Sequence, residues 1–296
     1  MVVSQPAFLA VDWGTTNRRV YAIDADGRVL ETERDDQGLL ATPPEAFADE
    51  VAGIRRRFGD VPVLCAGMVG SVRGWVEVPY VDCPAGIEQL AAHLHWIEPG
   101  RTAIVPGLAT RDPDRPDVMR GEEVQLLGAV ASGMAPDGAL LCQPGTHCKW
   151  ARIEAQRIAA FRTVMTGELF SLLKANSLLA DFLQGPVEDN QDFRDGVALA
   201  RSGHALAALF GERAGVLLGL RASRQVAARV SGILIGEDVR AQDLVRGETV
   251  HVLADAALGN LYVAAIREIG GEAVLLSSHE AFVAGIRMIW RHWNDR

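Results

Sequence analysis

Two turns rich in glycine and threonine hold the residues of this chain that are best suited to chemistry. One turn spans residues 12–17, the other spans residues 143–147, and each follows a short apolar segment. Such turns offer backbone N–H groups and hydroxyls to phosphate oxygens. A single turn of this kind is more often an ordinary hairpin with a capping aspartate. The occurrence of two favours a clamp that holds a triphosphate from both sides.

A carboxylate stands at the start of the first turn. Asp12 comes two residues before Gly14, where its oxygens could hold Mg²⁺, a hard cation that prefers oxygen ligands. The motifs of other nucleotide-binding proteins are missing from the sequence, which has no GxxxxGK[ST], no GxGxxG after a strand and no HRD or DFG set. P-loop, dinucleotide-binding and protein-kinase sites are therefore disfavoured.

A cysteine nucleophile is also a weak hypothesis. The four cysteines show no CxxC spacing and are too few for a disulfide framework in a chain of 296 residues, so we expect reduced thiols. His147 lies beside Cys148, but neighbours on a strand point to opposite faces. Their adjacency therefore gives little support to a Cys/His pair.

Short strands are the elements that must position the two turns. The first turn joins apolar strands at residues 8–11 and 20–23, and the second joins strands at residues 139–142 and 148–153. The other expected strands lie at 29–33, 61–66, 249–254 and 273–276. Helices are expected at 44–58, 164–183, 197–210, 217–231, 258–269 and 278–293, and one more begins at Glu122. We also expect a glycine-rich loop at 67–75 and an irregular loop at 106–121.

Composition limits the classes of protein that the chain can belong to. With 49% hydrophobic and 23% charged residues it is an ordinary globular protein, and its length favours two domains with a cleft between them. The net charge of −9 argues against a nucleic-acid or anionic-membrane surface. The sequence has no basic leader region and no apolar run of about 18 residues, so we expect a cytoplasmic protein.

Several motifs resemble those of a known family. Residues 12–19 and 143–150 look like the phosphate-1 and phosphate-2 motifs of the actin, hexokinase and Hsp70 superfamily. The following segments, in this order along nearly the whole chain, are similar to the 2-dehydro-3-deoxygalactonokinase family: Gly67-Met68-Val69-Gly70-Ser71 with Gly74-Trp75, Pro79-Tyr80, Arg120-Gly121-Glu122-Glu123 with Gln125, Pro144-Gly145-Thr146-His147 with Lys149-Trp150, and Thr166-Gly167-Glu168-Leu169-Phe170.

The resemblance implies an α/β fold, namely the two-domain actin-like ATPase (ribonuclease H-like) fold with a nucleotide cleft between the domains. The first domain would cover residues 1–120, with the phosphate-1 hairpin and the sugar-acid loop. The second would cover residues 121–296, with the phosphate-2 hairpin and the adenosine segment. The last helix would pack back on the first domain.

The family activity is phosphoryl transfer from ATP, with Mg²⁺, to the terminal hydroxyl of 2-dehydro-3-deoxy-galactonate. By resemblance, Asp12 would hold the metal. The residues implied in cofactor binding are Asp12, Gly14, Thr15, Thr16, Asn17, Arg19, Gly145, Thr146, His147, Lys149 and Asp255. Those implied in binding the substrate are Gly70, Ser71, Arg73, Trp75 and Glu168. Arg73 suits a carboxylate because a guanidinium can bind it through two hydrogen bonds.

The transfer also needs a carboxylate that accepts the hydroxyl proton. Related sugar kinases carry it at the start of the helix before phosphate-2, where this chain has Glu122 and Glu123. We predict Glu122 as the base and Glu123 as the alternative. Both could instead be first-turn glutamates that the helix dipole favours.

Departures from the family pattern leave the substrate open. The segment Ala254-Asp255-Ala256-Ala257 stands where paired glycines are usual, and Arg18, Arg73 and Cys148 are uncommon choices. One alternative is a kinase for another sugar acid or an anhydro-sugar, and another is a nucleotide-dependent binding or regulatory protein. The expected partners are ATP and a small sugar acid, and a homodimer is left open.

Overall fold

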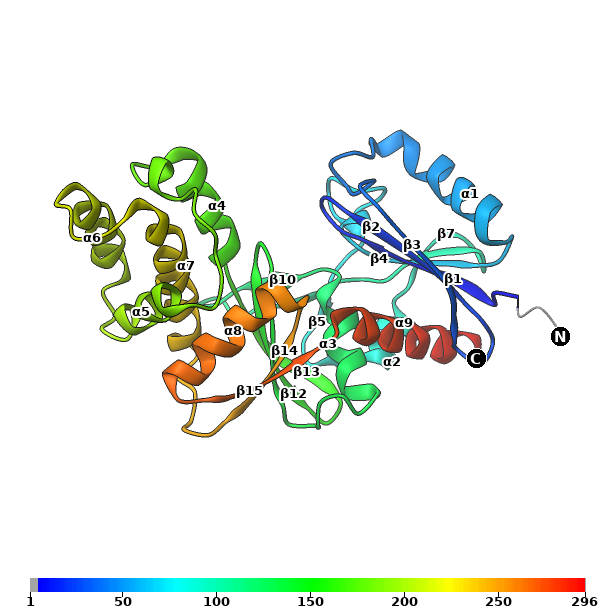
Figure 1. Cartoon of the computed structure of the whole chain (residues 1–296). Coiled ribbons are helices and arrows are strands. Elements are labelled where there is room, and N and C mark those ends of the chain that lie inside the picture. The colour runs from blue at the N-terminus through cyan, green and yellow to red at the C-terminus, as the bar shows by residue number, and fades with distance from the viewer. Residues whose placement is uncertain (1–4, 296) are drawn as a thin grey trace. The chain divides into compact units, whose positions relative to one another are not determined.

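The computed structural model describes residues 5–295, and the chain divides into two compact units. Unit 1 holds the chain up to Gly138, together with Arg152–Phe161 and the segment from Ser278 onward. Unit 2 holds Ala139–Ala151 and Arg162–Ser277. The structural boundary at Gly138 lies beyond the predicted domain boundary at Arg120. Figure 1 labels the elements of both units.

A six-stranded mixed sheet organises unit 1. Its strand order is β3-β2-β1-β4-β8-β7, with β1 antiparallel to β2 and parallel to β4. The strands are β1 (Phe8–Trp13), β2 (Arg18–Ile23), β3 (Val29–Asp35), β4 (Val63–Gly67), β7 (His95–Glu98) and β8 (Thr102–Ile104). The predicted hairpin, whose strands β1 and β2 lie before and after the first glycine-threonine turn, is confirmed.

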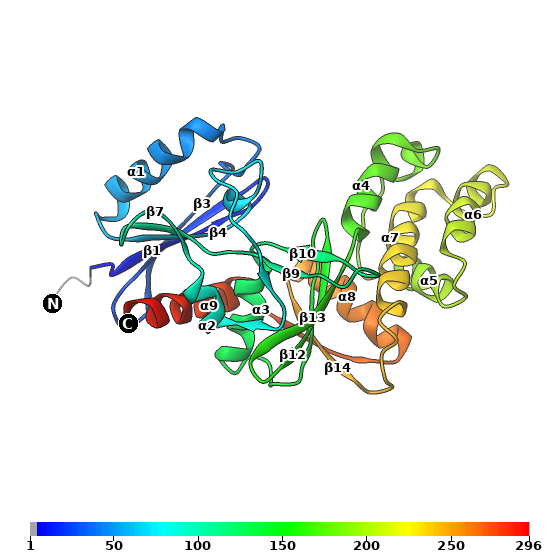
Figure 2. The same ribbon diagram turned by 180° about the vertical axis from the view of Figure 1, so that it is seen from behind.

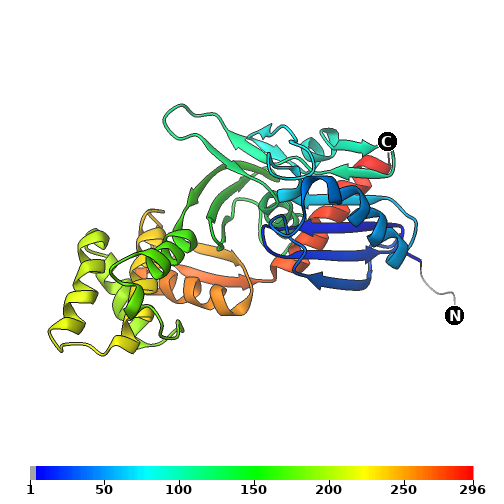
Figure 3. The same ribbon diagram turned by 90° about the horizontal axis from the view of Figure 1, so that it is seen from above.

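Helices lie on both faces of this sheet (Figures 1 and 3). Successive side chains of a strand point to opposite faces, and β1 is buried on both. Leu9 and Val11 share a core with Phe47 of α1 (Phe47–Phe58). Phe8 points to the other face, where its ring stacks on Trp290 of α9 (Ser278–Asn294) at 4.6 Å. The run of apolar residues in β1 follows from this double burial.

The helix α9 packs closely on α3 (Glu122–Ala131), through a glycine on each helix. A Cβ atom at Gly128 would collide with the carbonyl oxygen of Ala281, and one at Gly285 would collide with the carbonyl oxygen of Val124. Both helices belong to unit 1. The glycines therefore let the two backbones touch, which fixes α3 and its first residues on unit 1.

The expectation of an irregular loop at residues 106–121 is wrong. The segment forms β9 (Leu108–Thr110) and β10 (Asp117–Met119). In a three-stranded sheet, β9 lies between β10 and β5 (Val81–Asp82) and pairs with both. Pro113 and Pro116 lie in the connection between β9 and β10, where no ladder hydrogen bond is needed. Strands of two or three residues are too short to show a periodic pattern, so only the prolines were visible in the sequence.

A second mixed sheet organises unit 2. Strands β11 (Leu140–Gln143), β14 (Thr249–Leu253) and β15 (Glu272–Leu276) run parallel, in the order β15-β14-β11. The strand β12 (Cys148–Glu154) follows in the sheet beside β11, and β13 (Arg157–Val164) comes next. The ends of β12 and β13 that join to each other belong to unit 1, where Ile158 of β13 pairs with Ala85 of β6 (Ala85–Gly86).

Helices complete unit 2, and their bounds differ from those predicted. They are α4 (Thr166–Asn176), α5 (Gln191–Ala200), α6 (Ala205–Leu217), α7 (Ser223–Arg240) and α8 (Ala256–Ile269), with a short helical turn at Ala180–Phe182. Unit 1 also contains the small helix α2 (Ile87–Ala92). Figure 2 shows α5, α6 and α7 side by side. Polar caps set the starts: Asn190 accepts from the Phe193 N–H, and the Ala222 N–H donates to Gln225. In α6 and α7, apolar residues on most sides of the helix hid the breaks between the helices.

Among the described residues, no helix has the length and apolar character needed to cross a lipid bilayer.

Candidate active site

The phosphate-1 turn between β1 and β2 is held by a second loop of unit 1. The Gly14 N–H donates to the Asn17 carbonyl at 2.9 Å, which closes the turn. Leu39 and Leu40 then donate their N–H groups to the Gly14 and Thr15 carbonyls at 2.9 and 3.0 Å. The side chains of Thr15, Thr16 and Asn17 stay exposed. Their donors are therefore available to an anion, on a turn that is fixed from behind.

Asp12 and Arg19 face each other across the β1–β2 hairpin. They are register partners, and their charged groups lie 3.8 Å apart. The Asp12 side chain is 15% exposed. Burial raises the pKa of Asp12 to about 6, the positive charge of Arg19 opposes this rise, and the negative charge of Glu122 adds to it. The carboxylates of Asp12 and Glu122 repel each other, and a divalent cation between them would relieve this repulsion.

Arg18, in contrast, is part of the scaffold. Its guanidinium is buried, pairs with Asp35 at 2.6 Å and Glu50 at 2.8 Å, and lies over the ring of Trp13. This uncommon residue therefore joins β2 to β3 and α1, on the face of the hairpin opposite to Arg19.

Two close contacts of glycine residues bring the start of α3 to the end of β1. Gly121, with φ of +105°, leaves only 2.9 Å between its would-be Cβ and the Cα atom of Gly67. Gly67 has a φ of +95°, and a Cβ atom added to it would lie only 2.6 Å from the carbonyl oxygen of Trp13. Only glycine accepts these conformations and contacts without strain. Glu122 is thereby placed near Asp12.

The two glutamates of α3 have different surroundings. Glu122 is partly exposed, and its Oε2 accepts the Arg120 N–H at 3.0 Å. Glu123 is fully buried, and both of its oxygens accept the Gly121 N–H, at 2.7 and 2.9 Å. Burial, and next the charge of Glu122, raise the pKa of Glu123 to about 8. Of the two, only Glu122 is exposed enough for a substrate to reach, whereas Glu123 binds the Gly121 N–H at the start of α3.

The glycine-rich loop contains four predicted substrate residues, and much of it serves the fold. Gly70 is buried, Ser71 Oγ donates to the Met68 carbonyl at 2.7 Å, and Trp75 stacks on Phe47. Arg73 is exposed. The substrate roles of these four residues stay predictions, and Arg73 is the one whose charge faces solvent.

Arg120 is a residue whose importance the sequence reasoning missed. Its buried guanidinium donates to the Val78 carbonyl at 2.7 Å, lies 4.3 Å from the ring centroid of Tyr80, and packs against Gly70. Since its backbone N–H also binds Glu122, one residue connects the glycine-rich loop to the candidate base. Arg120 was quoted only as part of a motif, because contacts with distant residues leave no local pattern.

The phosphate-2 turn in unit 2 rests on the start of α4. A Cβ atom at Gly167 would collide with the Gly145 carbonyl, and the Glu168 N–H donates to the Thr146 carbonyl at 2.9 Å. The side chains of His147 and Glu168 are joined by a 2.6 Å hydrogen bond. Thr146 and His147 are exposed. Their predicted roles, and that of Glu168, therefore fall on one continuous piece of unit 2.

The remaining predicted residues of unit 2, Lys149 and Asp255, have different surroundings. Lys149 is buried, and its Nζ donates to Thr163 Oγ1 at 2.7 Å. Asp255 is exposed at the N-cap of α8, without a side-chain cap. Cys148 is buried with its Sγ 3.6 Å from that of Cys142, and burial raises the pKa of both thiols. A Cys148 nucleophile is thus disfavoured.

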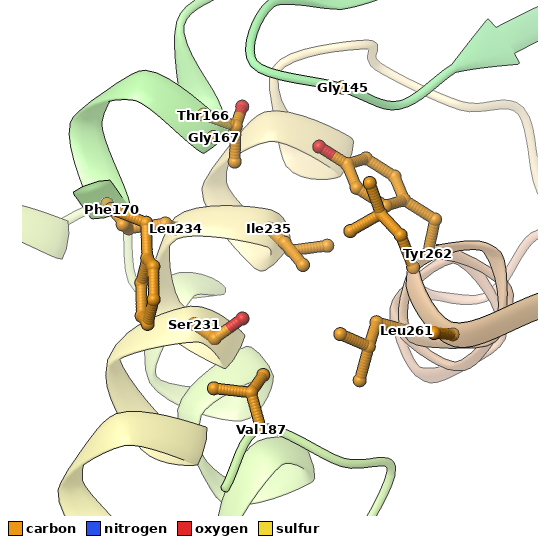
Figure 4. Close-up of a pocket in the computed structure, with 12 residues that line it drawn as sticks. Gly145, Thr166, Gly167, Phe170, Val187, Ser231, Leu234, Ile235, Leu261 and Tyr262 are labelled. Carbon is orange, nitrogen blue, oxygen red and sulfur yellow. The ribbon is translucent and has the colours of Figure 1, made fainter. Parts of the chain in front are cut away.

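An apolar cavity of about 280 Å³ opens beside Gly145 in unit 2 (Figure 4). The view shows Phe170, Val187, Ile235 and Leu261 around it, with the hydroxyl groups of Thr166, Ser231 and Tyr262 among them. The remaining lining residues are Gly167, Leu234, Ala257 and Leu258. Of the lining residues, the sequence motifs had included Gly145, Thr166, Gly167, Phe170 and Ala257, and the others were missed. A mostly apolar ligand with a few polar groups suits such a cavity.

Under the cavity, one buried carboxylate joins four elements of unit 2. Asp238 on α7 accepts hydrogen bonds from Trp150 Nε1 at 2.8 Å, Thr166 Oγ1 at 2.7 Å and the Tyr262 hydroxyl at 2.7 Å. Desolvation raises the pKa of Asp238, and these hydrogen bonds oppose the rise. Since Thr166 and Tyr262 line the cavity, Asp238 fixes its wall.

No cluster of three or more metal-ligating His, Cys, Asp or Glu side chains occurs within residues 5–295. A metal held by Asp12 would therefore need oxygen atoms of water or of a bound phosphate.

Comparisons with known proteins agree on one family. A family model described as 2-keto-3-deoxy-galactonokinase matches residues 12–289. The 2-dehydro-3-deoxygalactonokinase of Escherichia coli (strain K12) is 36% identical over 288 residues, which cover 95% of this chain and 97% of the relative. A crystal structure of a candidate 2-dehydro-3-deoxygalactonokinase from Sinorhizobium meliloti superposes with a TM-score of 0.89 at 34% identity, over 96% of this chain and 98% of that one.

A more distant structure bears on the fold alone. The activator of a 2-hydroxyisocaproyl-CoA dehydratase from Clostridium difficile, solved with bound ADPNP, has a TM-score of 0.50 at 12% identity and covers 97% of this chain and 96% of its own. The predicted two-domain actin-like ATPase fold is confirmed.

Proposed function

Since the chain belongs to the 2-keto-3-deoxy-galactonokinase family, we propose that it transfers the γ-phosphoryl group of ATP to the 6-hydroxyl of 2-dehydro-3-deoxy-D-galactonate. The products are ADP and the 6-phosphate of the sugar acid. One observation carries the proposal: two glycine-threonine turns with exposed donors, each built on its own hairpin. An accessible carboxylate, Glu122, accompanies the first turn.

Unit 1 supplies the groups for the transfer itself. The exposed donors of Thr15, Thr16 and Asn17 suit the oxygens of the transferred phosphoryl group. Glu122 accepts the proton of the attacking hydroxyl, and the hydrogen bond from the Arg120 N–H keeps its carboxylate in place. Asp12 would hold Mg²⁺, which neutralises phosphate charge when bound. The repulsion between Asp12 and Glu122 supports this assignment.

Unit 2 supplies the rest of the nucleotide site. Gly145, Thr146 and His147 form the second turn, and the neighbouring apolar cavity suits the adenine ring. Ala257 in the cavity wall belongs to the segment that replaces the paired glycines usual in the superfamily, and with Leu258 it would contact the base through apolar atoms. We place the reaction in the cytoplasm, where ATP is available.

The sugar-acid specificity rests on fewer observations. Arg73 is exposed on the glycine-rich loop and suits the substrate carboxylate. Because Arg73 departs from the family pattern, a kinase for another sugar acid is the second candidate. Both candidates share the phosphate-binding turns.

The test is a coupled assay of ADP release by the purified protein, with Mg-ATP and a panel of 2-keto-3-deoxy and aldonic acids. We expect the highest kcat/KM for 2-dehydro-3-deoxy-D-galactonate, and a phosphate monoester at C6 by ³¹P NMR of the product. A higher kcat/KM for another acid would select the second candidate. ADP release that no acid stimulates would refute both.

A further inference from the structure

Two of the three hydroxyl groups in the apolar cavity of unit 2 have no proton to offer to a ligand. Thr166 Oγ1 and the Tyr262 hydroxyl each donate to Oδ2 of Asp238 at 2.7 Å. Trp150 Nε1, which can only donate, binds the other oxygen, Oδ1. Burial above all raises the pKa of Tyr262 well above its usual value, so this hydroxyl keeps the proton that it donates. Towards the cavity, Thr166 and Tyr262 therefore present only acceptor lone pairs.

The third hydroxyl group, on Ser231 of α7, is free. The side chain is only 6% exposed, and its Oγ forms no hydrogen bond within residues 5–295. Serine inside a helix often donates to the carbonyl four residues earlier, and this serine does not. Figure 4 shows its hydroxyl pointing into the cavity. Among the described side chains that line the cavity, Ser231 is therefore the one that can donate a hydrogen bond to a ligand.

Ser231 lies at the end of the cavity that is remote from the phosphate-2 turn. Gly167 packs on the carbonyl of Gly145 in that turn, and its neighbour Thr166 binds Asp238. Ser231 precedes Asp238 by seven residues on α7, which corresponds to about 10 Å along a helix. This distance is comparable to the length of a nucleoside. A nucleotide with its phosphates at Gly145 would thus bring its base to Ser231.

The walls near Ser231 make an unpaired polar atom of the base costly. Phe170, Val187 and Leu261 line the cavity with apolar atoms, and the first two pack against a core cluster that includes the middle of α7. A polar group that leaves water for such a place without a partner loses binding free energy. The ring nitrogens of a purine are hydrogen-bond acceptors, so a base in this cavity needs a donor.

We propose that Ser231 selects adenine, by donating a hydrogen bond to a ring nitrogen of the base and accepting one from the neighbouring 6-amino group. The inference rests on the proposed function, because it takes the cavity as the site of the base of ATP. Adenine presents a ring nitrogen beside its 6-amino group on two edges, N1 on one and N7 on the other. One hydroxyl group, which both donates and accepts, can pair with both groups of either edge.

Guanine fits the same hydroxyl group poorly. On its N7 edge it presents two acceptors, N7 and O6, to a single proton. On its N1 edge it presents O6, N1–H and the 2-amino group, which are more polar groups than one hydroxyl can pair with. On either edge a polar atom of guanine stays unpaired against an apolar wall. We therefore expect GDP to bind about 10- to 100-fold more weakly than ADP.

The first experiment measures the dissociation constants of ADP and GDP for the full chain by isothermal titration calorimetry. Ser231→Ala should weaken ADP binding about 10-fold and reduce the preference for ADP over GDP. The matched control is Ser223→Ala, at an exposed serine on the same helix, and it should change neither value. In steady-state kinetics, Ser231→Ala should raise KM for ATP and leave KM for the sugar acid unchanged. Circular dichroism checks that each variant is folded.

A second experiment identifies the edge of the base that Ser231 contacts. 1-deaza-ADP and 7-deaza-ADP each lack one ring nitrogen of adenine. The analogue without the nitrogen that Ser231 binds should bind the wild-type protein about 10-fold more weakly than ADP does. The same analogue should bind Ser231→Ala as tightly as ADP does, because the contact is already lost. The other analogue should show no such coupling to the substitution.

Three results would overturn the inference. The first is a folded Ser231→Ala protein that binds ADP with wild-type affinity. The second is equal affinity of the wild-type protein for ADP and GDP, and the third is the absence of coupling with both deaza analogues. ADP release that the sugar acid stimulates would persist in each case, so the proposed function would stand. If the wild-type protein instead releases no ADP, the proposed function fails, and the calorimetry still decides whether Ser231 binds adenine.

Discussion

The Tyr262 hydroxyl donates a 2.7 Å hydrogen bond to the buried carboxylate of Asp238, and so joins α8 to α7 below the apolar cavity. Removal of one donor leaves a buried charged acceptor with fewer partners, which costs about 1–3 kcal/mol. We expect Tyr262→Phe to lower the free energy of unfolding by that amount and to raise KM for ATP more than KM for the sugar acid.

Denaturant titration and steady-state kinetics measure the two effects. Thr166→Val removes a second donor to the same carboxylate, so the two substitutions should not be additive in a double-mutant cycle. Strict additivity would show that Asp238 does not couple the two side chains.

Asp12→Asn should abolish most turnover and yet stabilise the protein at alkaline pH. Folding raises the pKa of Asp12 from 3.8 to about 6, so the native state disfavours the carboxylate. The stability contribution of Asp12 is complete below pH 3.8 and is lost as pH rises through 6, by up to roughly 2–3 kcal/mol.

The asparagine variant should therefore unfold at a higher temperature than wild type at pH 8, and the difference should shrink at pH 4. The exposed Asp26→Asn is the matched control and should show neither effect. Normal kcat of Asp12→Asn at saturating Mg-ATP would exclude a role of Asp12 in metal binding.

The two glutamates of α3 should respond differently to the same substitution. Glu122→Gln should lower kcat by about 10² to 10⁴, because the group that accepts the proton is lost. Nucleotide binding should survive, because the two phosphate-binding turns stay intact. Glu123 has a pKa of about 8 and is mostly protonated at neutral pH, so Glu123→Gln replaces a neutral group of similar shape.

We expect Glu123→Gln to have little effect on kcat at pH 7. Because the pKa of Glu123 is raised, wild type should lose stability as pH rises through 8, and the variant should not. Rapid-quench measurements on both variants separate chemistry from product release. If Glu123→Gln is the inactive variant, the base has been assigned to the wrong residue.

Thr146→Val should weaken phosphate binding by unit 2. The Thr146 side chain is exposed, while its backbone carbonyl holds the start of α4 through the Glu168 N–H. Valine keeps the volume and the backbone contact but removes the hydroxyl donor, so kcat/KM for ATP should fall by about 10-fold or more. Thr146→Ser restores the hydroxyl and should recover most of the activity. Equal kcat/KM in all three proteins would argue against a phosphate site at this turn.

Gly128→Ala should destabilise unit 1, because the new methyl group collides with the Ala281 carbonyl in the α3–α9 contact. Overpacking of this kind costs about 1–3 kcal/mol or more. The control is Gly53→Ala in α1, whose Cβ would meet only ordinary contacts and should gain up to about 1 kcal/mol from helix propensity. Thermal unfolding should move the two variants in opposite directions, and a shift of Gly128→Ala to higher temperature would contradict the contact.

The reliability of the sequence predictions varied along the chain for physical reasons. Both hairpins and the helix at Glu122 were predicted correctly, because turn residues and a helix start leave local signals. The breaks between α5, α6 and α7 were misplaced, since α6 and α7 carry apolar residues on most of their sides and show no clear period. Arg120 escaped notice because its partners Val78 and Tyr80 lie about forty residues earlier.

The candidate site shows the same division. The glycines and threonines of the turns could be listed from the sequence, but the cavity beside Gly145 could not. Its walls come from Phe170, Val187, Ile235 and Leu261, which are ordinary apolar residues in separate segments. Glu122 and Glu123 likewise differ in burial. Two glutamates side by side in the sequence give no sign of which one is buried.

The position of α9 has a consequence for the order in which the protein matures on the ribosome. By the time Ser277 is synthesised, every residue of unit 2 exists, but the helix that completes unit 1 does not. Until Ser278–Asn294 are made, the ring of Phe8 lacks its stacking partner Trp290, and Gly128 of α3 lacks the helix that packs on it. The scaffold of the phosphate-2 turn thus needs no residue after Ser277, whereas the scaffold around Asp12 and Glu122 is complete only when α9 has been made.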